Sequence, residues 1–282
     1  MKRTILIIGA QGMLGQELAQ AFNNEQPQCW DREQLDITDQ AMVTQKIREL
    51  RPNIVLNAAA YNDVDGAEKS ASIANFVNGE APGYLAQAVD AVGGILVHYS
   101  TEYVFRGNQE KGYTEADQPD PQSAYGRSKY RGEQRVRERT QRYYIIRLSR
   151  LFGKPGIGES GKKSFVHKIL ERAQTNSVVQ AIDEEVSCPT YAPDLAVQSK
   201  YIVDSQLPFG TYHVTNIGSC TWFGFAQEIF KLAGVSAKLA AVPGSVFPRP
   251  AVRPAYGILI NTKLPAMRSW QTALAEFISH GI

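Results

Sequence analysis

A glycine triplet directly after a short apolar run is the feature that most restricts how this chain can fold. Residues 4–9 (TILIIG) predict a strand buried on both faces of a sheet. Gly9, Gly12 and Gly15 follow as G-x-x-G-x-x-G and lead into helical periodicity over 14–22. Glycines let the backbone approach a pyrophosphate closely, and a helix N-terminus supplies free N–H groups. The order of strand, loop and helix predicts a site for a dinucleotide cofactor; the alternative is a tight turn that binds nothing.

Apolar runs and helical patterns alternate over the first 150 residues. Further buried strands are expected at 54–56, 95–99 and 143–148, and helices at 39–50, 67–91 and 123–140. This alternation predicts an α/β fold whose parallel sheet is doubly wound with right-handed crossovers. We therefore assign residues 1–150 to a Rossmann-type domain that binds NAD(P).

Residues 151–282 are expected to form a smaller α+β domain that binds the substrate. The glycine-rich stretch 153–163 predicts a mobile loop that could close over the substrate. Helices are expected at 165–176, 221–233 and 269–280, and eight prolines from 189 to 265 predict short, broken segments elsewhere. The boundary is soft, because elements of the second part could cross back onto the first.

Charge and composition argue against several classes of protein. The chain has 30 Lys+Arg and 28 Asp+Glu, so its net charge of +2 gives no reason to expect binding to nucleic acid or a membrane surface. No apolar run approaches the ~18–20 residues of a membrane span, and the first run is too short for a signal peptide. Cys29, Cys188 and Cys220 lie far apart, which favours reduced thiols in a cytoplasmic protein. The four histidines share no metal-ligand spacing, so no metal site is predicted.

Two residues after the first expected helix, where the next strand should end, bear on the choice of nicotinamide cofactor. Asp31 and Arg32 lie 22 and 23 residues after Gly9. An acid at this distance favours a free ribose 2′-hydroxyl, whereas an arginine favours a 2′-phosphate. Because both are present, NADPH and NADH both remain open. The alternative for Arg32 is a solvated surface residue.

A tyrosine and a lysine lie one turn apart at the start of a basic helix. Tyr125 and Lys129 form Y-x-x-x-K, which places both side chains on one face. A nearby ammonium favours a phenolate and would lower the tyrosine pKa from about 10. Ser100 and Thr101 follow the run 95–99, where parallel strands of such sheets present ligand-binding groups. Together these residues favour catalysis over a surface tyrosine beside a lysine.

This order of motifs resembles the extended short-chain dehydrogenase/reductase family, and more narrowly its dTDP-4-dehydrorhamnose reductases, over residues 4–277. The shared motifs are GAQGMLG (9–15), LDITD (35–39), NAAAYNDVDGAE (57–68), NGEAPGYLA (78–86), STEYVFRG (100–107), YGRSKYRGE (125–133), CPTYAPDLA (188–196), GTYHVTNIGSCTWFGFA (210–226) and AVRPAYGIL (251–259). The resemblance implies reduction by NADPH or NADH of the C4 keto group of a dTDP-4-keto-6-deoxy sugar.

The resemblance also implies roles for individual residues. At the cofactor it places Gly9, Gln11, Gly12, Met13, Leu14 and Gly15 on the pyrophosphate, Asp36 and Ile37 beside the adenine, Ala58, Ala59, Ala60 and Tyr61 beneath the cofactor, and Asn78 and Ser100 behind them. At the substrate it places Val64, Thr101, Glu102, Tyr103, Tyr125, Arg150 and Arg253. Thr101 would bind the substrate carbonyl, Tyr125 would deliver the proton, and Lys129 would hold the nicotinamide ribose.

Several positions depart from the family pattern on the substrate side. Glu102 stands where an aspartate is usual, Arg150 where a tryptophan packs on the sugar, and Gly66 where a lysine is common. We expect Arg150 to pair with Glu102; the alternative is that it receives an anionic or more polar sugar substituent. Glu17 matches one magnesium ligand of some members, but Pro193 replaces the second, so no metal is expected.

Other functions remain open. The chain could reduce a different nucleotide-linked keto sugar, with a talose-like or antibiotic sugar as product, or could be an epimerase that retains its cofactor. It could instead be a non-catalytic regulatory subunit of the methionine adenosyltransferase type, or a cofactor-binding redox sensor. Intact Thr101, Tyr125 and Lys129 argue against the regulatory role. A nucleotide sugar is the expected ligand, and a homodimer is left open.

Overall fold

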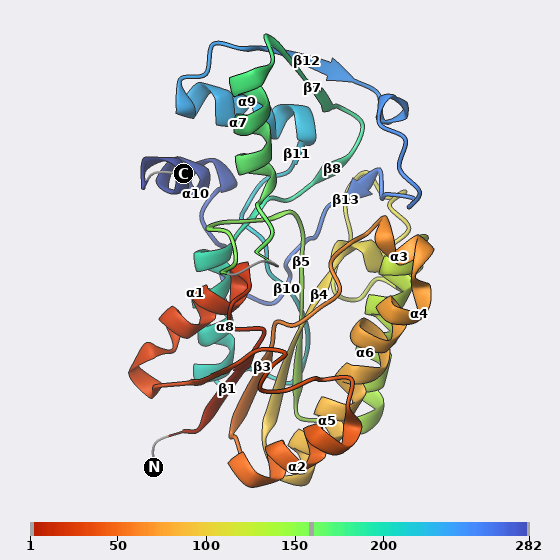
Figure 1. The fold of residues 1–282 in the computed structure, drawn as a ribbon, viewed down its shortest axis with the longest axis vertical. Helices are drawn as coiled ribbons and strands as arrows, with labels where there is room; N and C mark the ends of the chain where they lie inside the picture. The colour runs from red at the N-terminus through yellow and green to blue at the C-terminus, as the bar shows by residue number, and fades with distance from the viewer. Residues whose placement is uncertain (1–2, 158–160, 281–282) are drawn as a thin grey trace.

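A six-stranded parallel sheet forms the centre of the larger part of the molecule in the computed structural model, which describes residues 3–157 and 161–280 (Figure 1). Its strands are β1 (Ile5–Ile8), β2 (Gln28–Trp30), β3 (Ile54–Asn57), β4 (Ile95–Thr101), β5 (Tyr143–Leu148) and β10 (Gly210–His213). They lie in the order β10-β5-β4-β3-β1-β2, and every neighbouring pair is parallel. The predicted doubly wound sheet is confirmed, and its strand order switches direction between β1 and β3.

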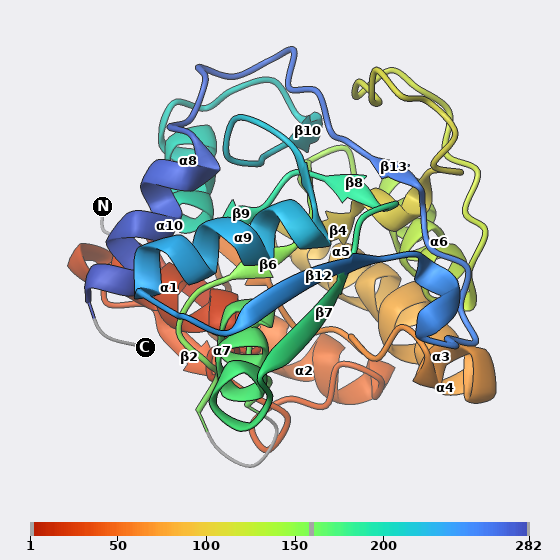
Figure 2. The same cartoon turned by 90° about the horizontal axis from the view of Figure 1, so that it is seen from above.

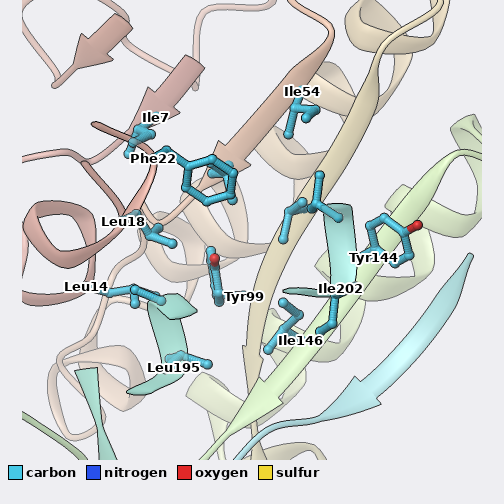
Figure 3. Packing of buried hydrophobic residues seen from close by; sticks show 14 of the residues in the cluster. Ile7, Leu14, Leu18, Phe22, Ile54, Tyr99, Tyr144, Ile146, Leu195 and Ile202 are labelled. Atoms are coloured by element: carbon cyan, nitrogen blue, oxygen red, sulfur yellow. The ribbon is translucent and has the colours of Figure 1, made fainter. Parts of the chain in front are cut away.

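Helices cover both faces of the sheet because its strands are apolar on both sides (Figure 1). One face carries α1 (Met13–Ala21) and α8 (Ala192–Asp204), and the other carries α2 (Gln40–Leu50), α5 (Ala81–Ala91) and α6 (Ala124–Arg139). Side chains alternate along β1: Ile5 and Ile7 belong to the core under α1 and α8, whereas Leu6 and Ile8 belong to the core under the other helices. Figure 3 shows the first core, in which Leu14 and Leu18 of α1, and Phe22 directly after it, lie among residues from the strands and α8.

The expected helix over 67–91 is confirmed in broken form. It consists of α3 (Gly66–Lys69), α4 (Ala71–Ala74), the π-helical segment Asn75–Glu80 and α5. This broken stretch packs along α6, the helix that carries the Tyr–Lys pair. The break therefore lies directly beside the predicted catalytic helix.

The remaining elements form a smaller layer above the carboxyl edge of the sheet (Figures 1 and 2). The helices α7 (Phe165–Thr175), α9 (Trp222–Ala233) and α10 (Trp270–Ser279) confirm the three helices expected in this region. Short strands complete it: β6 (Leu151–Phe152), β7 (Val178–Ile182), β8 (Val186–Ser187), β9 (Thr190–Tyr191), β11 (Cys220–Thr221), β12 (Lys238–Val242) and β13 (Tyr256–Gly257). These helices share an aromatic core with Phe152, Phe225 and Trp270.

The prediction of only short, broken segments around the C-terminal prolines is wrong at α8. Pro193 lies in the first turn of that helix, where the missing N–H has no intrahelical partner to lose. The helix packs against α1, and β10 extends the main sheet beside β5. Both elements come from the C-terminal half of the chain, yet β10 belongs to the sheet that the N-terminal half builds and α8 covers one face of that sheet.

The predicted mobile loop lies against the glycine loop. Its described parts, 153–157 and 161–163, contain no helix or strand, and residues 158–160 lie outside the described residues. The Ile157 amide donates to the Gln11 carbonyl at 2.8 Å, and the Gln16 side chain donates to the Pro155 carbonyl at 3.0 Å. Closure over a substrate remains a prediction.

Candidate cofactor and substrate site

The glycine loop between β1 and α1 is shaped by close backbone contacts. Gly9 has a φ of +77°, and a Cβ built on it would lie 2.8 Å from the Ala59 nitrogen. A Cβ on Gly15 would lie only 2.1 Å from the Gly9 carbonyl oxygen. In the described chain no side chain caps the N-terminus of α1, so its first amides are available to an anion. These features fit a dinucleotide pyrophosphate.

A second wall follows β3, at the point where the strand order switches. The Ala58 amide donates to the Ile8 carbonyl at 2.9 Å, which places this segment beside the glycine loop. The buried Asn78 side chain accepts from the Tyr61 amide at 2.8 Å and donates to the Tyr61 carbonyl at 2.9 Å. Asn78 thus holds the 58–61 backbone in place. Ligands of doubly wound sheets bind at such a switch point.

The residues expected at the adenosine end differ in their exposure and in the hydrogen bonds that they already make within the protein. Both oxygens of the Asp31 carboxylate accept from the Gln11 amide at 3.2 Å. Asp36 accepts from the Thr38 hydroxyl at 2.6 Å, and hydrogen bonds from Thr38 lower the pKa of that carboxyl. The Arg32 side chain is 88% exposed and lies 3.6 Å from Asp36. Of these three side chains, only that of Arg32 is largely exposed.

The predicted catalytic residues meet where β4 ends and α6 begins. Ser123 caps α6 by accepting from the Gly126 amide at 3.0 Å, which sets the position of Tyr125 in the first turn. Tyr125 is 8% exposed and lies within hydrogen-bonding reach of the Thr101 side chain. Lys129 is also buried, and its ammonium donates to the Tyr99 carbonyl at 2.6 Å. Burial lowers the pKa of Lys129 to about 8.

The expected lowering of the Tyr125 pKa is wrong for this structure. Burial raises the pKa of the phenol, and the neighbouring Glu102 carboxyl raises it further. The Lys129 ammonium donates to the Tyr99 carbonyl and not to the phenol. The phenol therefore keeps its proton at neutral pH, which is the form that a general acid requires.

The expected ion pair between Arg150 and Glu102 is also wrong. Among the described residues, no acid lies within ion-pair distance of Arg150. Its guanidinium donates to the carbonyls of Cys220, at 2.7 Å, and Glu185, and it lies 3.9 Å from the centre of the Trp222 ring. Carbonyl oxygens and an aromatic face, rather than a carboxylate, hold this cation.

The remaining substrate-side residues gather around Tyr125. Val64 and Tyr103 share an apolar cluster with it, and the Tyr103 ring meets the Tyr125 ring edge-on at 5.4 Å. Arg253 comes from a distant segment and pairs with Asp65 at 2.6 Å. The structure therefore brings Val64, Tyr103 and Tyr125 together. Arg253 is bound to Asp65, the residue that follows Val64.

A buried charge network under the site was not foreseen. Glu133, with no exposed surface, accepts from the Arg147 guanidinium at 2.6 and 2.8 Å and from the Ser100 hydroxyl at 2.6 Å. Burial alone would raise the pKa of Glu133, but pairing with Arg147 prevails and lowers it to about 2. The spacing of Tyr125, Lys129 and Glu133 at successive turns of α6 is the signal that could have revealed it.

Two further observations concern metals and membranes. Within residues 3–157 and 161–280, no group of three or more His, Cys, Asp and Glu is arranged to hold a metal ion. No helix in the same described part is long and apolar enough to span a membrane.

This fold and site define a dinucleotide-binding α/β protein in which a phenol, a hydroxyl and an ammonium meet at the carboxyl edge of the sheet. The chain belongs to the family described as the RmlD substrate binding domain, whose model matches residues 1–281. The resemblance inferred from the sequence motifs is confirmed.

Named relatives cover nearly the whole chain. It is 37% identical to a dTDP-4-dehydrorhamnose reductase of Streptomyces griseus, over 96% of this chain and 91% of that protein. It is also 37% identical to a probable dTDP-4,6-dihydroxy-2-methyloxan-3-one 4-ketoreductase of Streptomyces antibioticus, over 96% and 93%. The crystal structure of a Bacillus anthracis dTDP-4-dehydrorhamnose reductase in complex with NADP matches with a TM-score of 0.94 at 36% identity, over 99% of this chain and 100% of that one.

Proposed function

We propose that this protein uses NADPH or NADH to reduce dTDP-4-dehydrorhamnose to dTDP-L-rhamnose. The observation that carries this proposal is the meeting of Thr101, Tyr125 and Lys129 beside a glycine loop that fits a pyrophosphate. The relatives of matching length named as dTDP-4-dehydrorhamnose reductases support the choice of substrate. The assignment of individual cofactor and substrate contacts, and of residues 151–282 to the substrate side, is part of the same proposal.

The residues of this chain would position the sugar and supply its proton. When bound beside these residues, a reduced nicotinamide would supply the hydride that C4 receives. Thr101 binds the carbonyl oxygen, and Tyr125 transfers its phenolic proton to that oxygen as the C–H bond forms. The keto group thus becomes a secondary alcohol, and Tyr125 must regain a proton before the next turnover. Lys129 would hold the nicotinamide ribose near Tyr125.

The test is consumption of NADPH and NADH with dTDP-4-dehydrorhamnose, with Tyr125→Phe as the decisive variant. We expect kcat to fall by about 10²–10⁴-fold, because a general acid contributes rate enhancement of that order. Tyr130→Phe, which removes a hydroxyl five residues further along α6, is the matched control and should keep its rate. Turnover that survives in Tyr125→Phe would contradict the proposal. Cofactor binding without turnover of any keto sugar would favour the regulatory-subunit alternative.

A reductase of a different nucleotide-linked keto sugar, with a talose-like or antibiotic sugar as product, is the second candidate. Arg150 places a cation, bound only to carbonyls and an indole among the described residues, near the substrate-side residues Glu102 and Tyr103. A relative of equal identity is named for a different keto sugar. The configuration of the product at C4, measured by NMR, separates the two: rhamno supports the main proposal, and talo supports the alternative.

A further inference from the structure

The hydroxyl of Thr101 has one hydrogen to donate, and Glu102, the Tyr125 phenol and a substrate carbonyl are the groups that could accept it. In the structure Thr101 Oγ1 lies 2.6 Å from Glu102 Oε2 and is oriented as its donor. A carboxylate can only accept, and it holds a hydroxyl in a strong charge-assisted hydrogen bond. While Glu102 is ionised, Thr101 therefore cannot donate its hydrogen to a substrate carbonyl.

Glu102 lies in surroundings that disfavour its charge. The residue is 6% exposed, and its side chain lies against Gly257 of β13, where an added Cβ would lie 2.9 Å from Glu102 Cγ. Burial raises the pKa of the carboxyl to about 7.

Few charged or titratable groups act on Glu102. Those that face it are Tyr103 from its own segment, Tyr125 from α6, Arg150 after β5 and Cys188 after β8. Arg150 is the only cation among these four, and its guanidinium is bound elsewhere. Within residues 3–157 and 161–280, the carboxyl therefore lacks the close cation that would hold it ionised.

We propose that Glu102 must carry a proton for the reaction to proceed, because only then can Thr101 donate its hydrogen to the substrate carbonyl. This inference rests on the proposed function. The protonated Glu102 donates its O–H to Thr101 Oγ1, and the Thr101 hydrogen turns to the carbonyl oxygen beside Tyr125. Glu102 keeps its proton throughout turnover, since Tyr125 supplies the proton of the product. Glu102 is thus a positioning residue that acts through Thr101.

A neutral Glu102 also suits the charge that develops during the reaction. Negative charge builds on the carbonyl oxygen as hydride arrives, and donors aimed at that oxygen stabilise it. A carboxylate one hydrogen bond away would oppose this charge. Protonation thus removes a repulsion and supplies a donor in one step.

The first test is the pH dependence of kcat/KM for dTDP-4-dehydrorhamnose in three forms of the protein. The wild-type value should fall at least about tenfold from pH 6 to pH 8, since the pKa of Glu102 is about 7. In Glu102→Gln an amide N–H donates to Thr101 at every pH, so only about a twofold fall should remain, from Lys129 with its pKa of about 8. Glu102→Asp keeps a titrating carboxyl and should keep the large fall.

A second measurement needs no substrate. Infrared difference spectra of the wild-type protein should show a protonated carboxyl band that disappears with a midpoint near pH 7 and is missing in Glu102→Gln. An unchanged pH profile in Glu102→Gln, or a carboxyl already ionised at pH 6, would overturn the inference. If the band titrates as expected but the wild type reduces no sugar, the proposed function fails while the protonation of Glu102 stands.

Discussion

The proposed site has two edges that are built from different kinds of groups. The cofactor edge is the glycine loop with the segment 58–61, and the substrate edge surrounds Thr101 and Tyr125. At the cofactor edge, glycines and free amides do the shaping, as in the contact of Gly15 with the Gly9 carbonyl. At the substrate edge, buried ionisable side chains such as Glu102 and Glu133 are placed by strands and helices far apart in sequence. A backbone site depends on local spacing, whereas a buried charge depends on every element packed around it. The two edges should therefore fail in different ways when altered.

The largest effect is expected in the charge network of the substrate edge. Glu133→Gln leaves Arg147, 2% exposed, without its carboxylate partner. Removing one partner of a buried ion pair costs about 3–5 kcal/mol, because the remaining charge stays desolvated. We expect the free energy of unfolding, measured by urea denaturation, to fall by this amount.

A surface pair linked to the same helix provides the control for this prediction. Glu80 pairs with Arg131 and Arg135 of α6, and the three side chains are 23%, 50% and 31% exposed, against 0% for Glu133. Exposed pairs contribute about 0–1 kcal/mol, so Glu80→Gln should lower stability by no more than that. Equal losses in the two variants would show that burial does not set the strength of these pairs.

The difference between the edges also explains what the sequence could predict. The glycine loop, the strands β1, β3, β4 and β5, and the Tyr–Lys helix were predicted, because each is encoded in residues close together along the chain. The Arg150–Glu102 pair was predicted wrongly, because Trp222 and the carbonyls of Glu185 and Cys220 come from segments that sequence spacing does not place. Helix α8 was not predicted, because a proline such as Pro193 ends a helix when it lies in the interior but is tolerated in the first turn.

The pKa of Tyr125 is a second property that sequence spacing could not predict. The i, i+4 spacing placed Lys129 on the correct face, yet spacing alone cannot tell how deeply either group is buried. Burial and the Glu102 carboxyl together raise the pKa of the phenol. Neither influence can be read from the Y-x-x-x-K motif.

A smaller effect is expected at the cofactor edge from Gly15→Ala. The new methyl group would meet backbone atoms of Gly9 and Ala10 at 2.1 and 2.7 Å, and backbone cannot move aside as a side chain does. Overpacking of this kind costs about 1–3 kcal/mol, and the displaced loop should bind NADPH at least about tenfold more weakly. Urea denaturation and a fluorescence titration with NADPH measure the two effects.

The matched glycine for this test is Gly224 in the first turn of α9. A Cβ there would make only ordinary contacts, 3.5 Å from Cys220 and Thr221. Gly224→Ala should raise the unfolding free energy by about 0.5–1 kcal/mol, because alanine loses less backbone entropy in a helix. A Gly15→Ala protein as stable as Gly224→Ala would show that the loop is not closely packed.

The smallest effect on stability is expected from Arg32→Ala, at the exposed rim of the cofactor edge. The Arg32 side chain is 88% exposed and packs against no core, so Arg32→Ala should leave the unfolding free energy within about 0.5 kcal/mol of the wild type. Its guanidinium is available to a 2′-phosphate, and one charge-assisted contact of about 1.4 kcal/mol corresponds to tenfold in affinity. We therefore expect Kd for NADPH to rise about tenfold while Kd for NADH stays unchanged. Arg48→Ala, which removes an exposed arginine from α2, should change neither constant. If both cofactors weaken equally in Arg32→Ala, this residue does not read the 2′-phosphate, and the cofactor edge discriminates through its backbone alone.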